Sequence, residues 1–263
     1  MSAPIHVGIG GWDYEPWRGT FYPAKLAKSK QLEHAGRHVT AIEINATHYR
    51  LQKPESFRKW AASVPDGFKF SVKASRFCTN RRVLAEAGPG IANFCAQGFT
   101  ELGDKLGPIL WQFMDHKQFD PTDFGAFLKL LPRERDGLRL RHALEVRHDS
   151  FRHPDFIAMA RDADMAVVLA DSDDYPEIAD LTADFVYARL QRCREDCARG
   201  YGDVELDRWA AVAKGWAAGD APQGLAYVAN ARAPRLARET YVFFIAGAKV
   251  RAPVAAQALI ERL

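Results

Sequence analysis

The sequence has few cysteines and no large excess of charge of either sign. The first property excludes a disulfide-rich secreted domain, and the second excludes a general binder of nucleic acid or membrane surfaces. Its 263 residues include four cysteines, which are too few and too irregularly spaced for the disulfide framework of a small secreted domain. The formal charge of +3 is the difference between 36 basic and 33 acidic residues. That excess is too small for the strong field of a general nucleic-acid or membrane-surface binder. Any preference for anions must therefore be local.

Long hydrophobic runs are also missing. Residues 1–11 have no basic leader followed by an apolar segment, and no stretch has the apolar length that crosses a bilayer. We therefore expect a cytoplasmic protein with reduced cysteines and no membrane partner. With 48% hydrophobic and 26% charged residues, the chain has the composition of a globular protein that buries a core.

Short apolar runs alternate with longer stretches of helical periodicity, which is typical of βα units around a parallel sheet. Several runs lack strict polar alternation, as expected for strands that are covered on both faces. Eight strands with about eight helices in a chain of this length favour a closed (β/α)8 barrel of the TIM type over an open doubly wound sheet. The strands are expected at residues 5–9, 39–44, 68–72, 109–113, 143–146, 166–170, 185–190 and 241–245.

Helix starts are marked by proline and by capping residues. Pro54 and Pro154 suit a first helical position, Thr122 suits an N-cap, and the final stretch 252–263 is expected to be a helix with Pro253 near its start.

Two segments depart from this alternation. Residues 215–239, rich in Ala, Gly, Pro and Arg, are expected to be an insertion before the last strand. Within them, 225–228 is open to three interpretations: an extra strand, a loop, or the true eighth strand. Residues 191–202 are expected to be a polar loop after the seventh strand. Because no repeat or low-complexity linker divides the chain, residues 1–263 are expected to form a single barrel domain, regular or irregular.

Many of the predicted strands have a charged or amide residue at their carboxyl end. Because strand side chains alternate between two faces, Glu43 and Asn45 share one side, as do Glu145 and Arg147. Active sites of such barrels lie at the carboxyl ends of the strands, and buried charges need partners or water. The polar residues at the strand ends have two interpretations. They line a shared polar pocket, or they form ion pairs, Glu43 with Lys73 and Glu145 with Arg147, that only close the mouth of the barrel. These polar residues are Glu43, Asn45, Lys73, Gln112, Glu145, Arg147, Asp171 and Arg189.

A glycine-rich turn, residues 8–12, follows the first strand. It lacks the third glycine and the acidic partner of the dinucleotide fingerprint, so neither a nicotinamide nor a flavin signature is present and the cofactor is unknown. The turn is interpreted either as a tight turn capped by Trp12 or as a backbone approach to a ligand, with Trp12, Tyr14 and Trp17 as a stacking surface.

The segment after the last strand, 247–251, carries Lys249 and Arg251 just before a helix. Backbone N–H groups at a helix start together with two cations suit a phosphate site. The alternative is that both cations are solvated in a loop.

Metal signatures are weak. Cys193 and Cys197 have no second pair to complete a structural zinc site. His148 near two carboxylates offers ligands for a divalent ion, but the cations predicted around it would repel that ion. We predict no metal site, and His48 and His148 are equally suited to hydrogen bonds with the backbone.

Taken together, these motifs resemble the YecE-like family, also known as domain of unknown function 72, over nearly the whole chain. The resemblance implies a TIM-type barrel with a polar cleft at the strand ends, and it implies no particular reaction. The chain departs from the family's pattern at Thr47-His48, Gln191-Arg192 and Ile245-Ala246. The resemblance rests on Gly10-Gly11-Trp12-Asp13-Tyr14, Trp17, Gly19, Phe21-Tyr22-Pro23, Glu43-Ile44-Asn45, Tyr49-Arg50, Phe70-Ser71-Val72-Lys73-Ala74, Gln112, Glu145-Val146-Arg147-His148, Ala170-Asp171 and Tyr187-Ala188-Arg189.

The leading functional hypothesis is a hydrolase or isomerase that acts on an anionic, phosphorylated or carboxylated, sugar-like small molecule through carboxylate acid/base chemistry. The alternatives are a nucleic-acid-binding or phosphodiester-processing protein that uses Arg192, Arg194 and Arg199, and a non-catalytic ligand-binding barrel. The oligomeric state is not set by the sequence. The proposed catalytic residues are Glu43, Lys73, Glu145 and Asp171, and the proposed substrate-binding residues are Trp12, Asn45, Tyr49, Gln112, Arg147, His148, Arg189 and Lys249.

Overall fold

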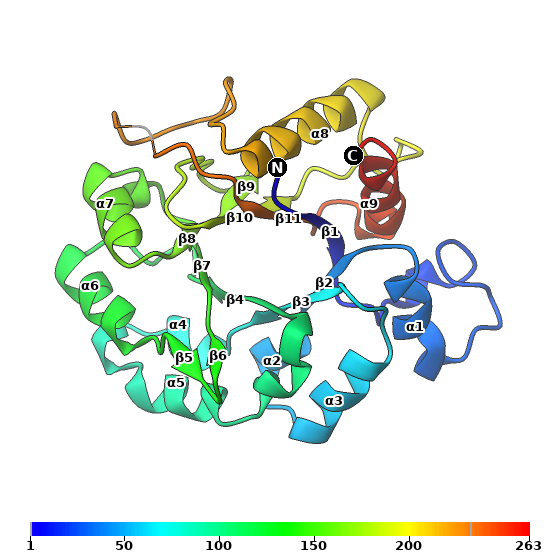
Figure 1. Ribbon diagram of the computed structural model, residues 1–263, viewed down its shortest axis with the longest axis horizontal. Coiled ribbons are helices and arrows are strands. Elements are labelled where there is room, and N and C mark those ends of the chain that lie inside the picture. The colour runs from blue at the N-terminus through cyan, green and yellow to red at the C-terminus, as the bar shows by residue number, and fades with distance from the viewer. Residues whose placement is uncertain (1, 232) are drawn as a thin grey trace.

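The parallel strands close into a ring that is surrounded by helices (Figure 1). The computed structural model describes residues 2–231 and 233–263. Every neighbouring pair of strands around the ring is parallel, so the predicted TIM-type barrel is confirmed. The strands are β1 (Ile5–Gly10), β2 (Ala41–Ile44), β3 (Lys69–Lys73), β4 (Leu106–Gln112), β7 (His142–Glu145), β8 (Ala166–Val167), β9 (Leu169–Asp171), β10 (Phe185–Leu190) and β11 (Glu239–Phe244).

The sixth strand position makes the barrel irregular. It is broken into β8, which pairs with β7, and β9, which pairs with β10. Val168 lies between the two pieces, and its N–H donates to the Leu144 carbonyl at 3.0 Å. The two halves of one strand therefore complete the ring, with β8 on one side and β9 on the other.

The helices cover the outer face of the ring. Those predicted to begin at Pro54 and Pro154 begin there, and Pro253 lies in the first turn of the last helix. The N-cap predicted at Thr122 is wrong, because the Asp120 carboxylate accepts the Thr122 N–H and Pro121 takes the first helical position. The helices are α1 (Gln31–Gly36), α2 (Ala46–Tyr49), α3 (Pro54–Ala62), α4 (Arg76–Thr79), α5 (Gly88–Cys95), α6 (Pro121–Leu130), α7 (Pro154–Asp162), α8 (Asp203–Ala218) and α9 (Ala252–Ile260). A short hairpin of β5 (Glu134–Arg135) and β6 (Leu138–Arg139) lies outside the ring. None of the helices in the described ranges is long and apolar enough to cross a membrane.

Two hydrophobic layers hold the barrel together. The larger fills the space between strands and helices, and the smaller fills the barrel interior. Because strand side chains alternate, Phe185 and Tyr187 of β10 point inward while Val186 and Ala188 pack on the outer layer. The interior layer consists of Ala41, Leu110, Ala143, Ala166, Val168, Ala183, Phe185, Tyr187, Tyr241 and Phe243.

Gly8 shows how tightly this interior is packed, and it supports a stability prediction. A Cβ atom built at Gly8 would lie 2.1 Å from the Ala41 carbonyl oxygen on the neighbouring strand. We expect Gly8→Ala to lower the free energy of unfolding by at least about 1–3 kcal/mol, because two backbones must separate. Urea denaturation measures this loss. Gly88→Ala is the control, since a Cβ there meets only Leu130 at 3.9 Å, and an equal loss in both variants would contradict the packing argument.

A half-buried ionic cluster closes the end of the barrel at which the strands begin. The Glu239 carboxylate accepts hydrogen bonds from Arg141, Tyr241 and His6. Arg141 also donates to the Tyr241 hydroxyl at 2.6 Å. This end is therefore filled by side chains that satisfy one another, which leaves the carboxyl ends of the strands as the place for an open polar site.

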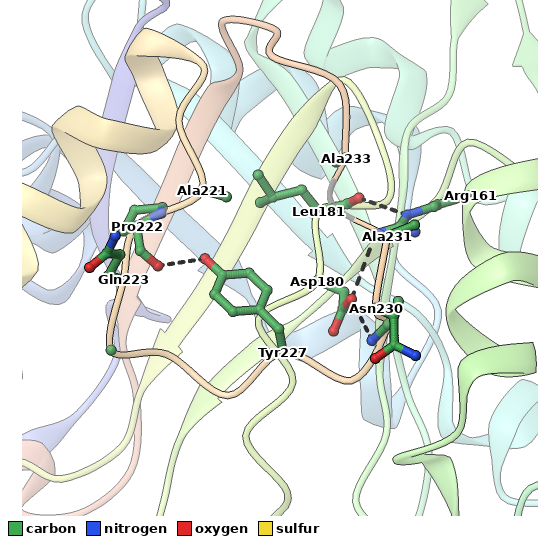
Figure 2. Close-up of a pocket in the computed structure, with 12 residues that line it drawn as sticks. Arg161, Asp180, Leu181, Ala221, Pro222, Gln223, Tyr227, Asn230, Ala231 and Ala233 are labelled. Carbon is green, nitrogen blue, oxygen red and sulfur yellow. Dashed lines mark hydrogen bonds and ion pairs between the residues drawn. The ribbon is translucent and has the colours of Figure 1, made fainter.

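The predicted insertion before the last strand is confirmed, and its segment 225–228 is a loop. Its predicted bounds, 215–239, were too wide, because residues 215–218 belong to α8 and Glu239 begins β11. The described residues between these two elements, 219–231 and 233–238, are drawn in orange in Figure 1. The buried Asp180 carboxylate anchors this loop by accepting the N–H groups of Val228 and Ala229. Figure 2 shows the pocket of about 280 Å³ beneath it, where Tyr227 turns toward Pro222 and Arg161 approaches Asp180. The insertion thus packs back on the barrel.

Candidate functional site

A buried network of charges centres on Arg189, at the carboxyl end of β10. Its guanidinium donates to both carboxylate oxygens of Glu145, at 2.5 and 2.6 Å, and to Glu43 at 3.1 Å. Glu43 comes from β2 and Glu145 from β7, and both are 0% exposed. Three inward positions on three strands therefore meet inside the barrel opening, as the strand-end pattern predicts. The predicted pair of Glu43 with Lys73 is replaced by Glu43 with Arg189.

Neutral side chains complete the hydrogen bonds of this network. The Gln112 amide donates to Glu145 at 2.5 Å, and the Tyr187 hydroxyl donates to Glu43 at 2.8 Å. Ser71 lies 2.8 Å from the same Tyr187 hydroxyl. Each carboxylate therefore has at least one neutral donor in addition to Arg189, which is what stabilises a buried anion.

Arg147 lies at the edge of the network. Its guanidinium donates to Glu145 at 3.3 Å and stacks 4.2 Å above the ring of Tyr175. The predicted pair of Glu145 with Arg147 is thus present. Arg147 Nε is enclosed without a hydrogen-bond partner, so this cation is only partly satisfied by the protein.

Lys73 is the one buried lysine of the part of the chain that the structure describes. It ends β3 on the inward face and is 7% exposed. Among the described residues its Nζ has no hydrogen-bond partner and no carboxylate oxygen within 4.0 Å. Burial, and then the nearby Arg189, lower the pKa of Lys73 to about 8, although Glu43 and Glu145 partly oppose the shift.

Lys249 reaches the same region from the loop after β11. Its ammonium lies 4.7 Å from the ring centre of Tyr14 and 5.5 Å from that of Trp17. Burial lowers its pKa, and Glu43 opposes this shift, which places the two charges within electrostatic range. Lys249 is therefore neither a fully solvated loop cation nor a paired one.

Asn45 and Trp12 lie beside the network and have different surroundings. Asn45 follows β2, and its amide nitrogen is 3.2 Å from where a Cβ of Gly10 would stand, so it faces the barrel opening. Trp12 packs edge-on against Trp60 and Phe70 in the layer between barrel and helices. Trp17 is fully buried, so it offers no stacking surface to a ligand.

Asp171 lies outside the network. Two residues after Leu169 on β9, it shares with that residue the face that packs on the helices. There it accepts hydrogen bonds from Arg192 at 2.7 Å and Tyr201 at 3.0 Å. The expectation that Asp171 shares one opening with Glu43 and Glu145 is not met, because Ala166 and Val168 face the barrel interior, so the strand period places Leu169 and Asp171 on the outer face.

Tyr49 and His148, two predicted binding residues, are also apart from the network. Tyr49 is 63% exposed and lies under the guanidinium of Arg76. His148 Nδ1 accepts the N–H of Ser150 and caps a short helical turn, which is the backbone role that the sequence left open. His48, in contrast, lies near Lys73: its Nδ1 contacts the Ala74 carbonyl at 2.9 Å, and burial followed by Lys73 lowers its pKa.

Comparison with known proteins identifies the family of this barrel. A family model described as "Protein of unknown function DUF72" matches residues 6–263. The chain belongs to the DUF72 family. The protein UPF0759 YecE of Escherichia coli K12 is 27% identical over 150 residues, which is 56% of this chain and 50% of that protein. The protein UPF0759 YunF of Bacillus subtilis is 32% identical over 79 residues, 30% of this chain and 27% of that protein. The chain thus spans half or less of the length of these curated relatives in the matched regions.

Solved structures of the family show the same fold. A DUF72 family protein from Thermotoga maritima has a TM-score of 0.73 with 20% identity, and the match covers 98% of each chain. A DUF72 family protein from Enterococcus faecalis has a TM-score of 0.67 with 16% identity, covering 99% of this chain and 98% of the other. At these identities the likeness establishes the irregular TIM-type barrel of this DUF72 protein and nothing about its chemistry.

Sequence reasoning missed three side chains of the network, and only one carried a usable signal. Tyr187 stands two positions before Arg189 on one strand, so the strand period places both on the inward face. Ser71 stands in the same relation to Lys73, but a serine in a strand is too common to mark a site. Tyr175 comes from the irregular loop after β9, where no period predicts an orientation. Strand periodicity therefore predicts the network residues that come from strands, but it does not predict the contacts that loops make with them.

The ionised Glu145 of this DUF72 protein predicts loss of stability in acid. Burial opposes its ionisation, but Arg189, Arg147 and Lys73 outweigh burial and lower its pKa to about 2. Folding lowers the pKa of Glu145 from its ordinary value of 4.5. The stability that this gives is therefore fully present above pH 4.5 and is lost as the pH falls toward 2. We expect the unfolding free energy of the unaltered protein to fall across this window more steeply than that of Glu145→Gln, in urea titrations at each pH. Parallel curves for the two proteins would contradict the assignment.

Proposed function

We propose that the strand-end network is the active site of an enzyme for an anionic, phosphorylated or carboxylated, sugar-like small molecule. The observation that carries the proposal is an excess of positive charge. Four cations, Arg189, Arg147, Lys73 and Lys249, face two carboxylates, Glu43 and Glu145. The Asp13 carboxylate also attracts Lys249, but it is paired with Lys28, so the described residues around the site still carry two more positive than negative charges. A sheltered cluster with uncompensated cations is favourable when an anion joins it.

The contacts divide the residues of this proposed site into two groups. Both terminal nitrogens of Arg189 donate to Glu43 and Glu145, so its proposed role is to position these carboxylates, and the ligand is left to other cations. Arg147 and Lys249 lie at the edge with unused donors, and they suit the anionic group of a substrate.

Proton transfer requires a group whose pKa lies near the working pH. Glu145 is held as a carboxylate by its cations, so its proposed role is electrostatic rather than that of an acid. Lys73, with a pKa of about 8, meets this requirement, and the Glu43 carboxylate near it in the network is its proposed partner in hydrolysis or isomerisation. This differs from the expectation that carboxylates alone carry the protons.

The nucleic-acid alternative has less support in the contacts. Arg192 is bound to Asp171 and Asp173, and Arg194 makes two hydrogen bonds to Glu205. Arg199 lies 3.4 Å from Asp203. Because each of these cations already faces a carboxylate, a phosphate backbone would compete with existing ion pairs.

Calorimetric binding of inorganic phosphate and of glycerol phosphate tests the proposal. We expect Arg147→Ala to weaken binding by about tenfold or more, because one of the cations that meet the anion is lost. Arg199→Ala is the matched control on a distant loop, and we expect it to leave binding unchanged. Absence of binding, or equal binding to both variants, would overturn the anion site.

A turnover screen with phosphorylated and carboxylated sugars tests the catalytic part. Glu43→Gln is expected to reduce the rate on any active compound by roughly 10²-fold, as removal of a proton-transfer group does. Binding without turnover of any compound in the screen would instead identify a ligand-binding barrel.

A further inference from the structure

Lys73 is placed unlike the other lysines that the structure describes. Lys105 donates to the carbonyls of Ala61 and Val64, and Lys117 pairs with Asp123. Lys73 alone is buried, and it makes no such contact among the described residues. Burying an ammonium without a partner is unfavourable, so its presence at the inner end of β3 calls for an explanation beyond stability.

The amine of Lys73 is enclosed but not sealed. In the described part of the chain, the fully enclosed polar atoms without partners include Arg147 Nε and Arg189 Nε. Lys73 Nζ is not among them although it also has no partner, so its amine is in contact with solvent. The charged and titratable groups around it come from four elements: Glu43 from β2, Glu145 and Arg147 from and just after β7, Arg189 from β10, and His48 from α2.

We infer that Lys73 forms a Schiff base with the carbonyl carbon of an anionic aldehyde or ketone, such as a 2-oxo acid or a sugar phosphate with a free carbonyl group. This inference rests on the proposed function and narrows its substrate class. The unpartnered amine inside the cluster supplies the nucleophile, and Arg147 and Lys249 supply positive charge for the anionic group.

The step balances without any oxidant or reductant. Lys73 first gives one ammonium proton to solvent, and the freed lone pair forms a bond to the carbonyl carbon while the C=O π electrons move to oxygen. A proton then passes from the nitrogen to that oxygen. The resulting carbinolamine takes up a proton on its hydroxyl group and loses water, which leaves a protonated imine. One ammonium and one carbonyl compound thus give one iminium ion and one water molecule, so the positive charge near Glu43 and Glu145 is retained.

The electrostatics of the site favour this chemistry. With a pKa of about 8, the amine of Lys73 is neutral at neutral pH to a roughly 300-fold greater extent than a lysine at its ordinary pKa of 10.5. Only the neutral amine attacks a carbonyl carbon. The buried carboxylates then stabilise the cationic imine that follows.

Borohydride trapping tests the inference. The whole protein is incubated separately with pyruvate, with dihydroxyacetone phosphate and, as an alcohol control, with glycerol phosphate; each mixture is reduced with borohydride and mapped by peptide mass spectrometry. We expect a secondary-amine adduct on Lys73 with a carbonyl probe, at least about tenfold more than on Lys69 of the same strand, and none with the alcohol. Lys73→Met should abolish the adduct at this peptide, and Lys69→Met should leave it, with thermal unfolding showing that both variants are folded.

The outcomes separate this inference from the proposed function. Adducts spread over exposed lysines with Lys73 unmodified would overturn the Schiff base. If phosphate binding still depends on Arg147 in that case, the anion site stands and only the covalent step falls. An adduct on Lys73 in a protein that binds no phosphate would support the reactive amine and overturn the anion site.

Discussion

Replacing Arg189 by methionine is expected to lower the free energy of unfolding by about 3–5 kcal/mol or more. Arg189 is the only cation bonded to Glu43 in the described ranges, and it makes two of the bonds to Glu145. Methionine has similar length but no charge, so the variant leaves two buried carboxylates with much less compensation. Urea denaturation at neutral pH measures the loss.

Two comparisons show whether this loss comes from the stranded carboxylates. Arg194→Met removes an exposed ion pair with Glu205, and it is expected to change stability by less than about 1 kcal/mol. Adding Glu43→Gln and Glu145→Gln to Arg189→Met is expected to restore part of the loss, because no buried anion then lacks a partner. An Arg189→Met protein as stable as the unaltered one would show that water compensates the carboxylates.

The barrel itself was predictable because its signal is periodic and repeated. The strands are largely buried on both faces, and several end in an inward polar residue such as Glu43 or Glu145, so repeated imperfect signals support one another. The predicted boundaries differ by a few residues, as for β4, which begins at Leu106 rather than at 109. Sequence periodicity shows where a strand lies more reliably than where its hydrogen bonds begin.

The partners inside the site were less predictable than its members. Glu43 and Lys73 lie at the ends of neighbouring strands, which suggests that they pair. Glu43 instead pairs with Arg189, which is distant in the sequence, because the planar guanidinium reaches two carboxylates at once. Asp171 shows the other limit: it is a polar residue at the end of its strand, as Glu43 is, but it lies an odd number of positions from the inward Ala166 and Val168 and therefore faces the helices. The cluster at the other end of the barrel, around Glu239, was missed because its members lie at the amino ends of their strands, where no active site is expected.

Replacing Lys73 by methionine is expected to stabilise the protein, in contrast to Arg189→Met. The folded protein lowers the pKa of Lys73 from 10.5 to about 8, so the charged lysine destabilises the fold by about 3 kcal/mol at neutral pH. Methionine fills the same space without an ammonium to bury. We expect the unfolding free energy to rise by about 2–3 kcal/mol, while the borohydride adduct is lost.

The pH dependence fixes the sign of this effect. Between pH 8 and 10.5 the unfolded chain binds the Lys73 proton more than the folded protein does, so this group makes the unaltered protein more stable as the pH rises through that window. The difference in unfolding free energy between Lys73→Met and the unaltered protein should therefore shrink across the window. A Lys73→Met protein that is less stable at neutral pH would mean that the lysine serves as a structural counter-ion for Glu43 and Glu145. If Lys73 is instead retained for its chemistry, its removal should stabilise the protein, because burial of its charge destabilises the fold.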